Sequence, residues 1–217
     1  KSTIMIKTEE AEKPVTISRV QIDGEPYLKI ANSDAMRPFF MSIVSDSNHW
    51  MFIASNGGLS AGRKNAEYAL FPYYTDDKIT ESAEITGSKT ILLVQKNGEV
   101  LPWEPFSERQ EDRYSISRNL FKNIYGNKIL FEEVNHDLDL LFQYQWSSSE
   151  TFGFVRKSRL ENKNADEIHI SILDGLQNIM PYGVGSQLQN VSSNLVNAYK
   201  RNELVKESGI GIFGLSA

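Results

Sequence analysis

The stretch of sequence that decides the fold is "LDLLFQYQW", which runs from Leu138 to Trp146. Its largest apolar residues occupy every second position, namely Leu138, Leu140, Phe142, Tyr144 and Trp146. A period of two is typical of a half-buried β-strand, because successive side chains of a strand point to opposite faces. The stretch therefore predicts a strand with one face in a hydrophobic core.

Further strand-like segments surround this stretch. "KILFEEV" (128–134) precedes it across a turn at residues 135–137, while "FGFVRKSRL" (152–160) and "EIHISIL" (167–173) follow it. Four strands in succession with short connections predict an antiparallel meander. Earlier in the chain the same patterning recurs, in "VTISRVQI" (15–22), "PFFMSIV" (38–44), "HWMFIA" (49–54) and "KTILLVQKNGEVLPW" (89–103), where Asn97-Gly98 marks a hairpin turn.

One segment has a helical period. In "SQLQNVSSNLVNAYKRNEL" (186–204) the spacing predicts a helix with one apolar face and Gly209 placed to stop it. The residues expected on that face are Leu188, Val191, Leu195 and Tyr199. The fold class predicted is therefore mainly β, a large antiparallel sandwich of two sheets with about one helix near the C-terminus.

Composition limits the number of domains and the classes of function that are possible. A chain of 217 residues with 40% hydrophobic residues suits a single domain, 1–217, with a real core. A formal net charge of −5 argues against nucleic-acid binding, and the lack of cysteine excludes disulfides and thiolate zinc sites. No apolar run reaches the ~20 residues of a membrane span. No cofactor or metal is expected. The cellular compartment is left unassigned, and the lack of a visible signal segment slightly favours the cytoplasm.

Three familiar motifs are weighed and set aside. Gly209–Gly214, "GIGIFG", fits G-x-G-x-x-G, but a predicted helix precedes it where the dinucleotide fingerprint needs a strand, so a glycine-rich strand is expected instead. The carboxylate pair Glu132-Glu133 lies in a strand, where neighbours face opposite sides and cannot flank one bond. Asp76-Asp77 suits capping or a salt bridge. No catalytic residue is assigned.

The segment from Gly62 to Ile79, "GRKNAEYALFPYYTDDKI", mixes aromatic rings with charges. Sugar rings need flat apolar plates beside hydrogen-bonding groups, and protein interfaces are rich in the same residues. A purely structural role, with Phe71 and Tyr73 plugging the end of the core, stays open beside these two. The carbohydrate or domain-interface contacts expected are Trp50, Arg63, Tyr68, Tyr73, Tyr74, Asp76, Asp77 and Lys78.

Several of these segments resemble a known family. "GRKNAEYALFPYYTDDKI", "GNKILFEEVNHDLDLLFQYQW", "GFVRKSRLEN" and "ILDGLQNIMPYGV" are similar to the N-terminal region of large bacterial glycoside-active enzymes related to cellobiose phosphorylases. In that family a β-supersandwich of galactose-mutarotase-like topology precedes an (α/α)6 barrel, which carries the chemistry. The resemblance implies a non-catalytic domain cut from a phosphorylase-like or hydrolase-like parent. Its partners would be the helical catalytic domain and an oligosaccharide.

Two other functions remain in view. A self-sufficient sugar epimerase of mutarotase type would need a histidine and a carboxylate as acid and base, with His49 or His169 and Glu132 or Asp174 as the candidates. The third possibility is an independent protein-interaction module with no link to sugars.

Overall fold

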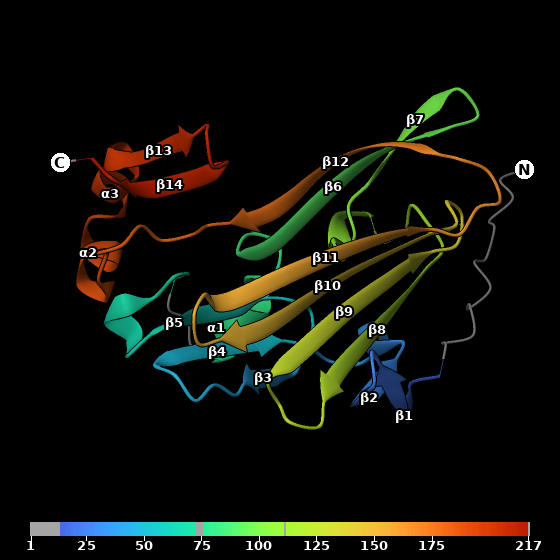
Figure 1. Ribbon diagram of the computed structural model, residues 1–217, viewed down its shortest axis with the longest axis horizontal. Helices are drawn as coiled ribbons and strands as arrows, with labels where there is room; N and C mark the ends of the chain where they lie inside the picture. Colours follow the sequence, from blue (N-terminus) through green and yellow to red (C-terminus); the bar gives the residue numbers. More distant parts are fainter. Residues whose placement is uncertain (1–13, 73–75, 111, 217) are drawn as a thin grey trace, which may run out of the picture.

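The computed structural model describes residues 14–72, 76–110 and 112–216. Fourteen strands and only three short α-helices make up this part of the chain, and every strand pairing is antiparallel. The predicted mainly-β antiparallel class is confirmed (Figure 1). The strands form one large sheet, two three-stranded sheets and a separate hairpin rather than two large sheets.

The large sheet has six strands in the order β1-β2-β8-β9-β10-β11. Their bounds are β1 (Thr16–Ile22), β2 (Glu25–Ala31), β8 (Ile116–Asn123), β9 (Lys128–Asn135), β10 (Leu140–Ser149) and β11 (Gly153–Asn162). The decisive stretch forms most of β10, with Leu140, Phe142, Tyr144 and Trp146 all buried, as the period of two predicts.

Two smaller sheets lie on the inner face of the large one. The first has the order β3-β4-β5, and the second the order β12-β6-β7. Their bounds are β3 (Phe40–Ile43), β4 (His49–Ala54), β5 (Leu59–Arg63), β6 (Gly87–Lys96), β7 (Glu99–Trp103) and β12 (His169–Gln177). The predicted turn joins β6 and β7, with Asn97 and Gly98 both at positive φ (55° and 81°), as a tight hairpin requires.

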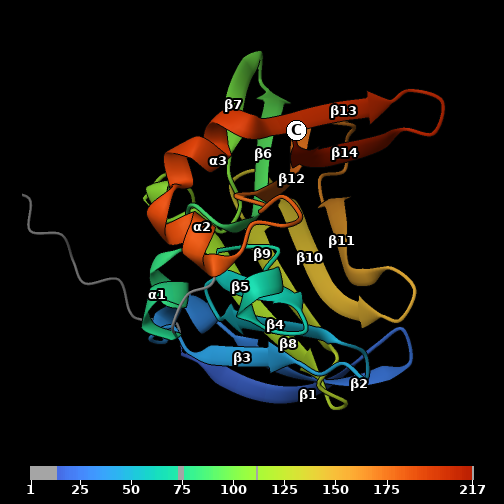
Figure 2. The same cartoon turned by 90° about the vertical axis from the view of Figure 1, so that its left-hand side faces the viewer.

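All three sheets share one core. Its buried residues include Ile53 from the first small sheet, Leu92 from the second and Phe142 from the large sheet. Figure 2 shows β3, β4 and β5 lying across the strands of the large sheet. Side chains from facing layers therefore interdigitate, and removal of this apolar area from water is the main force that holds the sheets together.

The predicted four-strand meander is wrong at its last strand. β9, β10 and β11 are neighbours, but β12 leaves the large sheet and pairs with β6 over nine residues, from His169 opposite Gln95 to Gln177 opposite Gly87. The connection at residues 163–168 is longer than a two-residue hairpin turn, so it does not hold β12 beside β11. It gives the chain enough length to change sheets.

The helix predicted near the C-terminus is interrupted. α2 (Ser186–Val191) and α3 (Ser193–Tyr199) meet at Ser192, and the last predicted helical residues form β13 (Lys200–Val205), which pairs with β14 (Ile210–Leu215). The expected apolar face was wrong: Leu188, Val191, Leu195 and Tyr199 are exposed, and the buried residue is Val196. Ser192 has non-helical backbone angles (φ −134°, ψ 35°), so α2 and α3 do not form one continuous helix with a common face.

The remaining helical elements are short. They are α1 (Asp76–Glu81) and the 3₁₀ turns η1 (Ser33–Ala35), η2 (Ala66–Tyr68) and η3 (Glu108–Gln110). Within the described ranges, no helix has both the length and the hydropathy that a bilayer span requires.

Candidate functional site

The surface predicted from the sequence begins at Trp50 on β4. Its indole ring lies over Gly62, its cross-strand partner on β5. A Cβ built at Gly62 would lie 2.6 Å from Trp50 Cζ2 and 2.6 Å from the Tyr68 carbonyl oxygen, so only glycine lets the η2 turn close over this strand. Trp50 is thus half-buried between β5 and its neighbours rather than presented as an open plate.

The backbone of Tyr68 lies close to Trp50, because both approach Gly62, whereas Arg63 is the cross-strand partner of His49. Arg63 ends β5 and is exposed, and the ammonium group of Lys64 lies 5.2 Å from the centre of the Tyr68 ring. Tyr68 keeps 44% of its surface exposed. Tyr68 and Lys64 can offer an aromatic ring with a cation beside it to a ligand or to another protein.

Lys78 belongs to a different place. It lies on α1, pairs with Glu81 at 3.1 Å, and α1 packs against Gly58 at the start of β5. Gly58 and Gly62 are separated by about 13 Å of extended strand, at 3.3 Å per residue. Arg63 and Lys78 therefore mark opposite ends of β5 rather than one compact patch.

The structure does not describe the side chains of the other predicted contacts. Tyr73 and Tyr74 lie outside the described residues, and so do the side chains of Asp76 and Asp77, whose backbone opens α1. Phe71 is 3% exposed in the main core, which agrees with the structural role considered for it.

Part of this segment is occupied by the chain itself. The carboxylate of Glu67 accepts hydrogen bonds from the backbone N–H of Ser186, at 2.9 Å, and from its hydroxyl group. The backbone N–H of Met180 donates to the carbonyl of Leu70 at 2.7 Å. The 62–79 segment thus holds the start of the C-terminal arm, and these hydrogen bonds keep the pKa of Glu67 below its usual value.

A cleft with polar and aromatic lining lies elsewhere on the described part of the chain. It has a volume of about 330 Å³ and lies on the inner face of the large sheet, where β8 and β9 meet the β4–β5 turn and the loop that follows β7. The residues that line it are Ser33, Asp34, Met36, Pro38, Ser55, Asn56, Ala83, Glu84, Phe106, Glu108, Arg118, Asn119 and Phe131. A volume of this size suits one small organic ligand.

Two aromatic rings form the apolar wall of the cleft. Phe106 packs edge to face against Phe131, with ring centres 6.3 Å apart, and also against Tyr144 at 5.1 Å. Phe106 has a φ of +66°, a left-handed conformation that residues with a side chain seldom adopt. Its backbone N–H donates to Glu133 Oε2 at 2.7 Å, and this bond helps to hold the unusual conformation.

Arg118 supplies hydrogen-bond donors at the base of the cleft. Its Nε donates to Glu133 Oε2 at 2.8 Å and its Nη2 to the Ser107 carbonyl at 3.1 Å, while its side chain is only 14% exposed. A guanidinium has five N–H donors, and these two bonds use only two of them. Arg118 forms no other side-chain hydrogen bond with the described residues, so its remaining donors are available to an oxygen atom in the cleft.

The rim of the cleft is acidic. Asp34 and Glu108 are exposed at its edge, and Glu84 lies between them and the interior. Burial alone would raise the pKa of Glu84, but hydrogen bonds and the charge of Lys89 outweigh it, so the pKa falls below its usual value. Three carboxylates thus line the cleft. Arg118 is neutralised by Glu133, and Glu84 is paired with Lys89 and with Arg109, whose Nε lies 3.7 Å from Glu84 Oε2.

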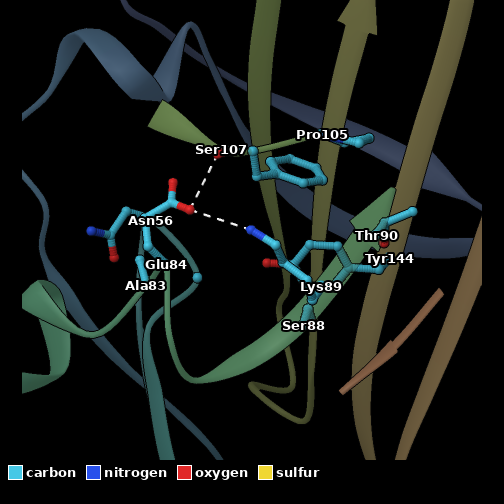
Figure 3. Close-up of a pocket in the computed structure, with 11 residues that line it drawn as sticks. Asn56, Ala83, Glu84, Ser88, Lys89, Thr90, Pro105, Ser107 and Tyr144 are labelled. Carbon is cyan, nitrogen blue, oxygen red and sulfur yellow. Dashed lines mark hydrogen bonds and ion pairs between the residues drawn. The ribbon is translucent and has the colours of Figure 1, made fainter. Parts of the chain in front are cut away.

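A narrow recess continues the cleft inward. It shares Asn56, Ala83, Glu84 and Phe106 with the cleft and holds about 20 Å³, room for roughly one water molecule. Figure 3 shows Glu84 accepting from Ser107 at 3.2 Å and from Lys89 at 3.3 Å. Lys89 also pairs with Glu104, so this cation is shared by two carboxylates.

The acid–base pairs considered from the sequence do not come together. Glu133 points into the core, to Trp103 and Arg118, whereas Glu132 faces the outer side of the sheet and accepts from Asn119 and Gln143. This confirms that Glu132 and Glu133 cannot flank one bond.

The histidines considered for mutarotase-type chemistry have no carboxylate partner among the residues that the structure describes. Within the described ranges, neither His49 nor His169 forms an ion pair with a carboxylate, and Asp174 is held by Arg156.

The cleft itself was missed from the sequence. Its polar groups come from five separate segments, and no local pattern in the sequence groups them together. Residues so far apart in the sequence come together only because the strand order of the sheets places their segments side by side.

Comparison with known protein families and with curated proteins finds no match to this sequence. A function for this chain therefore has to be inferred from its own geometry.

Proposed function

We propose that this chain is a non-catalytic β-sandwich domain of a carbohydrate-active protein, and that the cleft at Phe106 and Arg118 takes one neutral sugar unit. The observation that carries the proposal is the meeting of two phenyl rings with unused guanidinium donors and carboxylate acceptors in one cleft.

These groups match the two chemical sides of a pyranose. The C–H face of a sugar packs on an aromatic ring such as Phe106, while its hydroxyl groups both donate and accept. Arg118 can donate to a hydroxyl oxygen, and Asp34 can accept from a hydroxyl hydrogen. Charge-assisted hydrogen bonds of this kind contribute about 1.5–3 kcal/mol each, which lets a small site discriminate between ligands.

The charge of the cleft narrows the ligand class further. Asp34 and Glu108 are exposed carboxylates that disfavour a phosphate or a carboxylate. The nearby cations are already paired, Arg118 with Glu133, and both Lys89 and Arg109 with Glu84. Neutral saccharides are therefore favoured over sugar phosphates and uronic acids.

The resemblance seen in the sequence is consistent with this role. In a longer parent protein the domain would support a helical catalytic domain, and the exposed group of Arg63, Lys64 and Tyr68 is the proposed contact. Tyrosine and arginine are frequent at the centre of protein interfaces.

Isothermal titration against a panel of neutral oligosaccharides, glucose 6-phosphate and glucuronate tests the proposal. We expect heat from at least one neutral sugar and none from the two anions at equal concentration. Asp34→Ala should weaken the neutral sugar about tenfold, the equivalent of one charge-assisted hydrogen bond. Because Asp34 is exposed, the variant should keep its fold.

Asp166→Ala provides the matched control, since Asp166 is also exposed and lies in the connection between β11 and β12. It should leave binding unchanged. If no neutral sugar gives a heat of binding, or if both substitutions weaken binding equally, the cleft is not the sugar site. A polarimetric anomerisation assay separates binding from mutarotase-type catalysis, for which only the buffer rate is expected.

A further inference from the structure

The C-terminal hairpin of β13 and β14 is unusual because both of its faces are exposed. Leu204 is 64%, Ile210 59% and Ile212 51% exposed, although all three are large and apolar. In Figures 1 and 2 the hairpin projects from the body, far from β1, and neither of its edges pairs with another described strand. An isolated two-stranded hairpin is marginally stable in water, whereas three or more strands form a stable sheet.

The two edges of the hairpin differ in charge. β13 carries Lys200, Arg201 and Glu203, whereas β14, "IGIFGL", carries no charge and no proline. Charged residues are the usual protection of an edge strand against pairing with other chains. Of the two edges, β14 is therefore the one prepared to accept another strand.

The sequence of β14 is complementary to itself. Two identical antiparallel strands related by a twofold axis through Ile212 place Ile212 opposite its own copy. The same register places Gly211 opposite Phe213, and Ile210 opposite Gly214. Gly211 then faces the aromatic ring of Phe213, a pairing that compensates for a glycine in an edge strand. Neither Gly211 nor Gly214 has a neighbour within 4 Å of its Cβ position, so both faces of β14 are open at these residues.

We propose that β14 pairs with β14 of a second copy of this chain, antiparallel and centred on Ile212, to form a closed dimer with a continuous four-stranded sheet. The order of strands is β13-β14-β14-β13, which leaves the charged β13 strands at the two outer edges. The contact uses the same surface on both copies, as a twofold dimer requires.

Sedimentation velocity over a range of protein concentrations tests the proposal. Wild-type protein should sediment as a dimer at high concentration and dissociate on dilution. Ile212→Lys places two like charges opposite each other at the twofold axis, and should raise the dimer dissociation constant at least about tenfold. Ile212→Glu should do the same, and an equimolar mixture of the two variants should restore the dimer, because opposite charges then face each other.

Ile172→Lys on β12 is the matched control, because Ile172 is also 51% exposed and the substitution is the same. It should leave the dimer intact, and circular dichroism should show that all variants keep the wild-type spectrum. A wild-type monomer at every concentration would overturn the proposal. A dimer indifferent to Ile212→Lys, a mixture that stays monomeric, or open-ended assembly in place of a dimer would each overturn it as well.

Discussion

The guanidinium of Arg156 on β11 donates two hydrogen bonds to the carboxylate of Asp174 on β12. Nη2 donates to Oδ1 at 2.8 Å and Nη1 to Oδ2 at 2.9 Å. Because β12 leaves the large sheet, no ladder of backbone hydrogen bonds joins these two strands. The bidentate pair instead connects the large sheet to the β12-β6-β7 sheet by side chains alone.

Neighbouring groups complete this connection. Ser158 and Thr90 each donate to Asp174 at 2.6 Å, and the guanidinium of Arg156 lies 5.1 Å from the centre of the Tyr144 ring. The side chain of Arg156 is 9% exposed. A charge that is buried to this degree depends on its partner, so removal of either residue leaves the other unsatisfied.

Arg156→Ala should lower the free energy of unfolding by about 2 kcal/mol, the range for a charge-assisted hydrogen bond lost at a mostly buried site. Urea unfolding of the single variants and of the double variant with Asp174→Ala measures the coupling, and the double variant should lose less than the sum of the singles. Arg159→Ala is the control, because Arg159 and Glu161 form an exposed pair that should contribute under about 0.5 kcal/mol. Equal losses in both cases would contradict a special role for Arg156.

The same pair predicts how stability depends on pH. Burial would raise the pKa of Asp174, but hydrogen bonds from Arg156, Ser158 and Thr90 outweigh it and keep the pKa below its ordinary value. The contribution is therefore complete above the unfolded-state pKa of about 4 and is lost as the pH falls through the lower folded-state pKa. Unfolding free energies between pH 7 and pH 2 should decline less steeply below pH 4 in Asp174→Asn than in wild type. Parallel curves would show that the pKa of Asp174 is the same in the folded and the unfolded protein.

Gly58→Ala should destabilise the fold. A Cβ at Gly58 would lie 2.1 Å from the carbonyl oxygen of Ile79, a backbone atom in α1 that cannot move aside alone. Overpacking of this kind costs about 1–3 kcal/mol. Thermal unfolding compares it with Gly175→Ala, where nothing lies within 4 Å and the change should be within about 0.5 kcal/mol. If the two variants melt alike, α1 does not pack on β5 as described.

Glu108→Gln should relax the discrimination of the cleft against anions. The substitution removes one of the three negative charges at the cleft without changing its shape. The affinity for glucose 6-phosphate relative to neutral glucose should rise about threefold at low salt, and this gain should shrink in 0.5 M NaCl as the charges are screened. Glu99→Gln, an exposed residue on β7 outside the cleft, should change neither affinity.

The sequence predicts the local elements of this protein well. β4 has the bounds expected from "HWMFIA", β9 begins at the expected Lys128, and the Asn97-Gly98 turn lies where its residue types require it. These features depend on residues that are close in the chain. Alternation and turn chemistry are visible there without knowledge of the fold.

Features that depend on distant pairings were not predictable in the same way. Nothing within residues 167–173 shows that β12 will pair with β6, since its alternation would serve either sheet. The cleft has the same difficulty, because Asp34, Glu84 and Arg118 meet only after β8 has been placed beside β2. Surface composition near residues 62–79 suggested a site, yet Glu67 uses part of that surface to bind Ser186.

The left-handed backbone at Phe106 determines how the cleft meets a ligand. Its ring orientation is set by the bond to Glu133 and by packing against Phe131 and Tyr144, all present before any ligand arrives. A preorganised wall would spare the proposed sugar the entropic cost of ordering a loop, so its binding should show no slow conformational step.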